Sequence, residues 1–517
     1  MRKQTLIKGA LTVLSASIIT RLLGFIFRVY IADKLGAEGM GLYQLVTSLY
    51  MLVATFATSG ISLAVSRMIA EQLAANKYGE TKVILKISIS WSLFISLLVA
   101  IILFMFANTI GEYILRDPRT TYSIRSLAPS IPFMTVASCI KGYFYAIRKS
   151  LHPSNATVIE QIAKMVFIAL LIGFYIQKGD AYTCAIVSMG MTVGEIISCA
   201  YMIATFYADK NIKLQKKTKC KKVFWEIIKI SLPIQTSSTF NSALRLTEGV
   251  LIIEGLRSFT SGDSSAAIGA YGIIKGMVLP LLLFPTSLLQ AIITVLIPEL
   301  SGANAGGREK TIRRACSKTL QLTLIMGICI AAIFLIFPQE IAGLFYHDPA
   351  VGPMIKKLCL LCPLMYLEMV CVGILNAIGE QVASMRYNII DGFMRLILIY
   401  LFIPKGGVDA FLIIMMISNL FTSLLNLYHL LKVTCLPLCF SNWLFKPSMS
   451  AFVTALASLF LKNHLGNILP IWAAIGILVI FMTIFYIILL FVFGCFGKTE
   501  INFVKSCYKA KKKKHCN

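Results

Sequence analysis

Two arginines interrupt the first apolar stretch of the sequence. Arg21 and Arg28 lie in the run from Ile18 to Arg28, whose other residues suit a membrane span. An arginine near mid-membrane costs about 2.5–3.5 kcal/mol, so it faces a partner or a wet cavity rather than lipid. Two helical turns separate the two residues, which places both on one helix face about 10 Å apart. This spacing indicates an anion-binding stripe. The alternative is that Arg21 pairs with a buried carboxylate and Arg28 extends to the membrane surface.

Other charged residues in apolar segments fall into two local pairs. Glu160 precedes Lys164 by one helical turn, so the two side chains can neutralise each other. Asp391 and Arg395 have the same spacing. We interpret both as ion pairs with a structural role.

Arg245 is a candidate partner of Arg21 in binding an anion. A shift of 224 residues places it on Arg21, so two equivalent helices would present their guanidinium groups to one cavity. A guanidinium group binds pyrophosphate in a bidentate manner. Glu248, three residues after Arg245, is expected to orient it.

The remaining intramembrane charges have no such local partner. Lys141 and Lys275 have no acidic residue three or four positions away, so they face the cavity or pair between helices. The lone carboxylates are candidate ligands of a proton or cation, or partners of bases on neighbouring helices: Glu195, Glu254 and Glu368.

Composition places these residues in a membrane protein. The 517 residues are 57% hydrophobic and only 14% charged, with a mean hydropathy of +0.79, which is outside the range of soluble globular domains. The net charge of +26 is concentrated in short loops and in the tail at Lys511–Lys514, a distribution that sets membrane topology and argues against nucleic acid as a partner. Most of the Lys and Arg fall on one side if both termini are cytosolic.

The chain is predicted to be an all-α polytopic membrane protein with fourteen transmembrane helices. Each apolar window is long enough to cross about 30 Å of hydrocarbon. The windows are 9–31, 41–66, 86–108, 126–147, 156–177, 181–207, 227–255, 268–297, 318–338, 354–378, 387–403, 409–431, 448–462 and 469–493.

The sequence also repeats itself. A shift of 228 residues matches Gly41 with Gly269 and Tyr43 with Tyr271, and a shift of 231 places the pair Glu160/Lys164 on Asp391/Arg395. Six crossings per copy give both copies the same orientation, with a cavity between them. The predicted domains are a six-helix lobe at 1–208, a basic cytosolic linker at 209–226, a second six-helix lobe at 227–432, and two additional helices with a basic tail at 433–517.

The sequence contains none of the signatures of common enzymes or metal sites. It has no phosphate-binding Gly-Lys-Ser/Thr loop, no His-Glu-x-x-His motif and no nucleophile elbow. The cysteine pairs Cys359/Cys362 and Cys435/Cys439 lie in apolar surroundings without nearby histidines, which favours small core residues over metal ligands. We therefore expect neither an enzyme nor a cofactor.

The first span continues with Thr20–Phe25 and the stretch Lys34–Tyr43 (KLGAEGMGLY). Together with the six-plus-six-plus-two plan, these residues resemble the multidrug/oligosaccharidyl-lipid/polysaccharide exporter superfamily, and within it the stage V sporulation protein B group. The resemblance implies a flippase that moves undecaprenyl-pyrophosphate-linked saccharides across the bacterial plasma membrane by alternating access. It implies substrate contacts at the positions that match the family's cationic cavity, Arg21, Arg28 and Arg245.

The resulting hypothesis is a flippase of lipid-linked cell-wall precursors, serving the peptidoglycan of the spore cortex. Its partners would be the lipid-linked saccharide, membrane lipids and cell-wall synthesis proteins, and it would act as a monomer. Two alternatives stay open: a cation-coupled exporter of organic cations, which requires a cavity dominated by acids, and a non-transporting membrane scaffold for wall synthesis.

Overall fold

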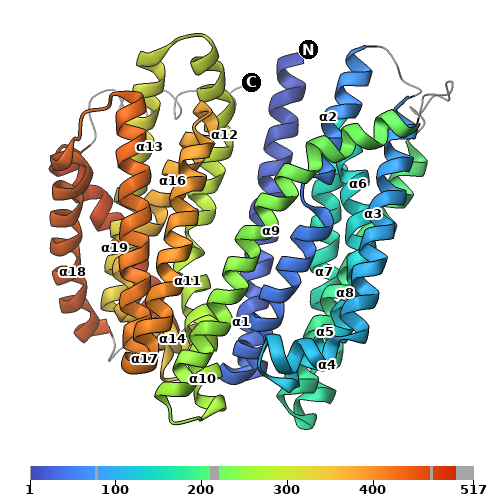
Figure 1. Cartoon of the computed structure of the whole chain (residues 1–517). Helices are drawn as coiled ribbons and strands as arrows, with labels where there is room; N and C mark the ends of the chain where they lie inside the picture. Colours follow the sequence, from blue (N-terminus) through green and yellow to red (C-terminus); the bar gives the residue numbers. More distant parts are fainter. Residues whose placement is uncertain (1, 76–79, 210–219, 466–469, 496–517) are drawn as a thin grey trace. The chain divides into compact units, whose positions relative to one another are not determined.

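A computed structural model describes residues 2–75, 80–209, 220–465 and 470–495. The described residues form helices joined by turns, without a β-strand (Figure 1). Eleven helical segments within them are long and apolar enough to cross a membrane. The expectation of an all-helical polytopic membrane protein is confirmed. Most of the predicted basic linker and the whole of the basic C-terminal tail lie outside the described residues.

The chain forms two compact units, each with its own set of helices. Unit 1 comprises residues 1–287 and 389–414, and unit 2 comprises residues 288–388 and 415–517. This division follows the packing of the helices, and the duplicated lobes remain a prediction.

Unit 1 contains the helices that carry most of the candidate residues. They are α1 (Arg2–Thr58), α2 (Ile61–Ala74), α3 (Glu80–Met105), α4 (Ala107–Thr109), η1 (Ile110–Ile114), η2 (Pro118–Thr120), α5 (Thr121–Leu127), α6 (Ser130–Ala146), α7 (Leu151–Tyr175), η3 (Ile176–Lys178), α8 (Asp180–Ala208), α9 (Cys220–Phe259), α10 (Ser264–Tyr271), η4 (Gly272–Val278) and α11 (Leu279–Leu283). The central part of α17 (Gln381–Thr434) completes this unit.

Unit 2 is built from the helices that follow. They are α12 (Thr286–Ala305), α13 (Glu309–Ile336), α14 (Pro338–Phe345), α15 (Val351–Leu358), η5 (Cys359–Leu361), α16 (Cys362–Ile378), the two ends of α17, η6 (Ser441–Phe445), α18 (Lys446–Leu465) and α19 (Ile471–Val492). Its core includes Tyr486, whose hydroxyl donates to the carbonyl of Ile325 at 3.1 Å.

Glycines reverse or break the longest helices. Gly36 in α1 and Gly407 in α17 have φ angles of 64° and 54°, values that suit glycine because it lacks a Cβ. The predicted spans 9–31 and 41–66 therefore lie in one segment with a sharp bend at Gly36. Gly60 (φ 79°) separates α1 from α2, which ends the second helix earlier than expected. A Cβ on Gly60 would lie 2.5 Å from the carbonyl oxygen of Ser231, so α9 approaches this break closely.

Prolines account for further differences from the predicted spans. The window 268–297 was expected to be one helix, but the chain breaks near Pro285 between α11 and α12. Pro129 stands between α5 and α6, and Pro280 and Pro363 occupy the first turns of α11 and α16. Proline suits a first helical turn because its missing N–H has no partner there in any helix.

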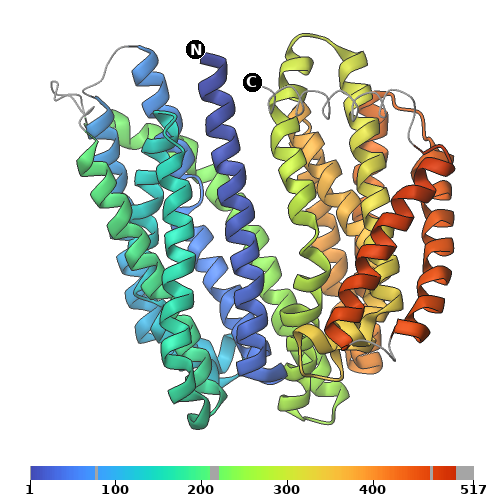
Figure 2. The same cartoon turned by 180° about the vertical axis from the view of Figure 1, so that it is seen from behind.

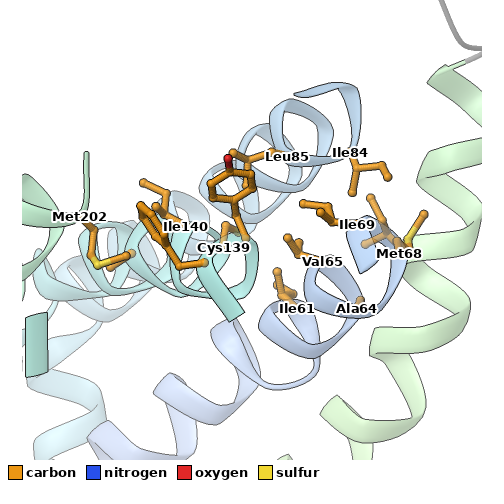
Figure 3. Close-up of a cluster of buried hydrophobic side chains, with 14 of the residues drawn as sticks. Ile61, Ala64, Val65, Met68, Ile69, Ile84, Leu85, Cys139, Ile140 and Met202 are labelled. Atoms are coloured by element: carbon orange, nitrogen blue, oxygen red, sulfur yellow. The ribbon is translucent and has the colours of Figure 1, made fainter. Parts of the chain in front are cut away.

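An apolar core holds α2, α3, α6, α8 and the start of α9 together. Figure 3 shows Ile61, Val65 and Ile69 of α2 facing Ile84 of α3 and Ile140 of α6. Gly142 allows the backbones of α6 and α2 to approach, since a Cβ there would lie 2.6 Å from the carbonyl oxygen of Ser62. Small residues at such crossings are typical of helix packing in membranes.

Candidate functional site

Twelve of the thirteen candidate residues lie in unit 1, and Glu368 alone lies on α16 in unit 2. Within unit 1 the structure gathers most of them into two charged groups. The first group is formed by α9, η4 and α17, and the second by α6, α7 and α8.

The first group, here termed the buried ion cluster, consists of Glu248, Lys275, Asp391 and Arg395. The ammonium of Lys275 lies 2.8 Å from one carboxylate oxygen of Glu248, and the guanidinium of Arg395 lies 3.2 Å from the other. Arg395 also forms an ion pair with Asp391, one turn earlier on α17. The two acids are 7% and 2% exposed. Two acids and two bases balance, so the cluster adds no net charge to the helices.

Close helix contacts explain how these four residues meet. A Cβ on Gly249, beside Glu248, would lie 2.8 Å from the hydroxyl of Tyr271, and one on Gly255 would lie 2.8 Å from Ile403 of α17. Lys275 belongs to the π-helical segment η4, a geometry often found at functional positions. Its ammonium lies 5.7 Å from the ring centre of Phe411, at cation–π distance.

The second group surrounds Glu195 on α8. Glu195 is buried and interacts electrostatically with Glu160 and Lys164 of α7 and with Lys141 of α6. The ammonium of Lys164 also lies 5.3 Å from the ring centre of Phe27 on α1. Gly194 permits this arrangement, because a Cβ there would lie 2.9 Å from the carbonyl oxygen of Glu160. Like the buried ion cluster, this group contains two acids and two bases.

The three candidate arginines are less enclosed. Arg21 and Arg245 have exposed side chains, and Arg28 is half-buried. Arg245 interacts electrostatically with Glu248, although the ion pairs of Glu248 are made with Lys275 and Arg395. α1, which carries Arg21 and Arg28, packs against α9, which carries Arg245.

Sequence reasoning missed a third charged group at one end of unit 1. This helix-end cluster consists of Glu38, Arg116, Asp117, Arg119, Glu254 and Arg257, of which only Glu254 was a candidate. Figure 1 shows the helix ends concerned at the lower end of α1, α4 and α10. These residues are far apart in the sequence, so their spacing does not indicate a cluster. In a sequence, charges near the ends of membrane spans are interpreted as determinants of topology.

Arg119 is at the centre of the helix-end cluster. Its guanidinium donates to both carboxylate oxygens of Asp117, at 2.9–3.3 Å, and to Glu38 at 2.6 Å. The hydrogen bond with Asp117 is the main cause that raises the pKa of Arg119, with a smaller contribution from Glu38. The side chain therefore keeps its charge at every physiological pH.

The end of α9 joins the same cluster. Arg257 lies 3.8 Å from Asp117, and it donates to the carbonyl of Arg116 at 2.8 Å. Arg116 in turn forms an ion pair with Glu254. The cluster thereby connects the first bend of α1 and the loop after α4 to the α9–α10 connection.

Backbone contacts reinforce this connection next to the charges. A Cβ on Gly272 would overlap the carbonyl oxygen of Ala37, and one on Gly41 would overlap that of Ile268. These contacts bring the segment 37–43 against 268–272, and the sequence repeat pairs Gly41 with Gly269 and Tyr43 with Tyr271. Two segments that match each other in the repeat thus pack together within unit 1.

The described residues contain no group of three or more His, Cys, Asp or Glu side chains that could hold a metal ion. Eleven cysteines of the described residues are free thiols, and most of these are buried. The site is therefore one of charged side chains among apolar helices.

Apolar helices of membrane-spanning length define the class as a polytopic helical membrane protein. The family model described as "Polysaccharide biosynthesis protein" matches residues 6–304, more than half of the chain, so the chain belongs to this family. A second model, "MatE", matches residues 256–401.

Individual relatives agree with this assignment. "Stage V sporulation protein B" of Bacillus subtilis (strain 168) is 26% identical over 406 residues, covering 77% of this chain and 78% of the relative. "Lipid II flippase MurJ" of the same organism is 22% identical over 429 residues, covering 76% of each chain. The superfamily resemblance read from the sequence is confirmed.

Solved structures show the same fold. The structure described as "Lipid II flippase MurJ, inward closed conformation" has a TM-score of 0.70 at 16% identity, covering 92% of this chain and 97% of the other. An inward-facing MATE family multidrug transporter of the MOP superfamily has a TM-score of 0.64 at 14% identity, covering 82% and 98%. The fold is thus shared by lipid flippases and multidrug exporters.

Proposed function

We propose that the protein is a flippase for lipid-linked cell-wall saccharides that works by alternating access. The observation that carries the proposal is the pair of arginines within the apolar first half of α1, where only a partner or an anionic ligand offsets the cost of burial in a membrane. The family, whose relatives include a lipid II flippase, supports the same function.

We place fourteen membrane crossings in the chain. The bends at Gly36 and Gly407 divide α1 and α17 into two crossings each, and α5–α6 and α9 supply two more beyond the eleven apolar segments. α10–α11 and α12 together form one broken crossing. The first twelve crossings form two six-helix lobes, and α18 and α19 are the additional pair.

Arg21, Arg28 and Arg245 are the substrate-binding residues in this proposal. The two charge-balanced groups contribute no net charge, so the excess positive charge of the pathway comes from these arginines. A diphosphate needs such an excess, and guanidinium groups bind it with two parallel hydrogen bonds. Lys275 lies beside Glu248 and Lys141 interacts with Glu195, so either lysine would have to leave its acid to contact the cargo. We therefore assign both lysines a structural role in helix packing.

The remaining acids act as counter-ions in this proposal. Glu248, Asp391, Glu160 and Glu195 neutralise the basic residues of the two groups. Glu254 belongs to the helix-end cluster, and Glu368 is the one candidate coupling residue in unit 2.

The helix-end cluster closes the outer end of the pathway in this proposal. With both termini in the cytosol of the producing bacterium, the bend at Gly36 and the α9–α10 connection lie on the outer side of the plasma membrane. Opening there requires the ion pairs of Arg116, Arg119 and Arg257 to separate. Outward movement of an anionic headgroup gains about 2.3 kcal/mol per charge per 100 mV of membrane potential, which offsets part of this cost.

The relatives support a proposal for the cargo's origin and for the partners. We propose peptidoglycan precursors of the spore cortex as the cargo, because the chain resembles a sporulation protein over most of its length. We further propose that it acts as a monomer beside cell-wall synthesis proteins.

A second candidate is a cation-coupled exporter of organic cations, which the match of residues 256–401 to the MatE model favours. Its substrate would require unpaired acids on the pathway, whereas the acids described above sit beside bases.

One experiment separates the two candidates. The purified protein is reconstituted in vesicles, and leaflet exchange of an undecaprenyl-pyrophosphate saccharide is compared with uptake of a fluorescent organic cation. Exchange of the lipid without cation transport supports the flippase. Cation transport without lipid exchange refutes it.

A further inference from the structure

A pocket of about 580 Å³ opens between α3 and the start of α9, apart from the charged groups described above. Its walls are Val83, Lys86, Ile87, Ser90, Trp91 and Phe94 of α3, and Phe224 of α9. Figures 1 and 2 show the beginning of α9 running beside α3. The volume lies within the range of ligand sites in proteins, about 300–1,000 Å³.

The shape of the pocket fits one lipid chain. Its α3 residues recur every three or four positions, so they form one continuous helix face from Val83 to Phe94. The eleven helical steps from Val83 to Phe94 span about 16 Å, close to half of the roughly 30 Å of membrane hydrocarbon. An acyl chain of a single leaflet therefore matches the groove in length.

The aromatic walls give the groove a defined form. The ring of Trp91 meets that of Phe224 edge-on at 5.0 Å and stacks beside Phe94 at 6.4 Å. Tryptophan is enriched where the hydrocarbon meets the headgroups, because its indole is apolar with one polar N–H. Ser90 and Lys86 are the polar members of the wall.

Basic side chains beside the groove would favour a lipid with an anionic headgroup. Lys86 has an exposed side chain, and Lys82 lies one helical turn before it. α9 contributes Lys229, which is also exposed. Glu226 is the exposed acid on this part of α9. Among the described side chains on these parts of α3 and α9, basic residues thus outnumber acids, and Lys86 itself lines the groove.

We propose that this groove is a binding site for an anionic glycerophospholipid of the inner leaflet. One acyl chain lies along α3 against Trp91, Phe94 and Phe224, and the phosphate is bound by Lys86. The site is distinct from the proposed cargo pathway, because none of its wall residues belongs to the three charged groups.

Tryptophan fluorescence tests the proposal on the full-length protein. The chain contains four tryptophans, Trp91, Trp225, Trp443 and Trp472, so replacing the last three by phenylalanine leaves Trp91 as the only reporter. The variant is placed in lipid nanodiscs with small amounts of dibrominated phosphatidylglycerol or dibrominated phosphatidylcholine, whose bromines quench nearby indoles. We expect the anionic lipid to reach half-maximal quenching at a mole fraction about fivefold lower, the factor for one basic residue at an anionic surface.

Two charge variants assign the preference to the pocket. Lys86→Gln should equalise the two lipids, whereas Lys310→Gln, an exposed lysine in the first turn of α13, should leave the preference unchanged. If the triple replacement fails to fold, native mass spectrometry compares phosphatidylglycerol retention by the wild type and the two lysine variants.

Three results would overturn the proposal. Equal quenching by both lipids refutes the headgroup preference, and a preference that survives Lys86→Gln refutes the assigned contact. Displacement of the brominated lipid by equimolar undecaprenyl pyrophosphate assigns the groove to the cargo's prenyl chain instead.

Discussion

The buried ion cluster and the helix-end cluster use the same kinds of side chain in different surroundings. In the buried ion cluster, Glu248 and Asp391 are 7% and 2% exposed and lie between apolar helices. In the helix-end cluster, the side chains of Arg116 and Glu254 are 52% and 39% exposed, whereas Asp117, the partner of Arg119, is 2% exposed. Removing one partner from a buried pair leaves an uncompensated charge and costs about 3–5 kcal/mol, whereas an exposed pair contributes about 0–1 kcal/mol.

This difference indicates different roles. The buried ion cluster fixes the packing of α9 against η4 and α17, because separating its charges in a low-dielectric interior is costly. In the helix-end cluster the exposed pair of Arg116 and Glu254 can separate at modest cost, since water replaces this contact. We therefore interpret the first as a permanent part of the fold and the second as a contact that forms and breaks during transport.

The largest effect is expected from breaking the buried ion cluster. Glu248→Ala leaves Lys275 without its ion-pair partner and Arg395 with Asp391 alone, so it should destabilise the protein by about 3–5 kcal/mol. Thermal unfolding in detergent should show a large decrease in Tm or loss of folded protein.

A charge-balanced control sharpens this prediction. Glu248→Leu combined with Lys275→Met removes one acid and one base together, and should recover much of the lost Tm because the remaining pair of Asp391 and Arg395 stays neutral. Equal Tm values for wild type and Glu248→Ala would show that the cluster does not hold the helices.

The second-largest loss of stability is expected at a backbone contact beside the helix-end cluster. Gly272→Ala places a Cβ against the carbonyl oxygen of Ala37, and overpacking of this kind costs about 1–3 kcal/mol. Gly302→Ala is the matched control, because nothing lies within 4 Å of a Cβ there. Tm values should decrease for the first variant alone; a similar Tm for both would contradict the close contact of α1 with η4.

Loss of a pathway arginine should affect transport without affecting stability. Arg21→Ala removes a bidentate phosphate contact, so leaflet exchange should slow at least tenfold, equivalent to about 1.4 kcal/mol. Arg67→Ala is the control, because Arg67 is exposed and pairs with Glu71 one turn away. Unchanged exchange in Arg21→Ala, with normal Tm, would remove this residue from the pathway.

The smallest stability effect is expected in the helix-end cluster. Arg116→Ala removes the ion pair with Glu254, with a cost of about 1 kcal/mol or less because both side chains are exposed. Hydrogen exchange of residues 260–266 should become faster, since the end of α9 is held less firmly to the loop after α4. Unaltered exchange there would mean that the cluster does not restrain the α9–α10 connection.

The sequence was sufficient to predict a helical membrane protein and to place most of the charged candidate residues on helices. Apolar windows depend only on local composition, so they predicted the helical membrane class. Breaks at Gly60 and Pro285 were missed because an apolar window continues across them. The bend at Gly36 needs a positive φ. Glycine permits this conformation, but most glycines do not adopt it at a bend, so the sequence alone did not predict the bend there.

The ion-pair partner of each charged residue was harder to predict than the helix that carries it. The spacing of Asp391 and Arg395 suggested an ion pair, and the structure contains one. Glu248 was expected to orient Arg245, but its ion pairs join Lys275 and Arg395, which come from other helices. Pairing between helices depends on tertiary packing, and local spacing carries no information about it.

The central claim is that the arginines of this chain guide a lipid-linked diphosphate across the membrane. The most direct test is leaflet exchange of an undecaprenyl-pyrophosphate disaccharide in vesicles that contain the purified wild-type protein. The account predicts exchange well above that of protein-free vesicles, with a marked decrease in Arg245→Ala. Folded wild-type protein that leaves the lipid in its original leaflet would contradict it.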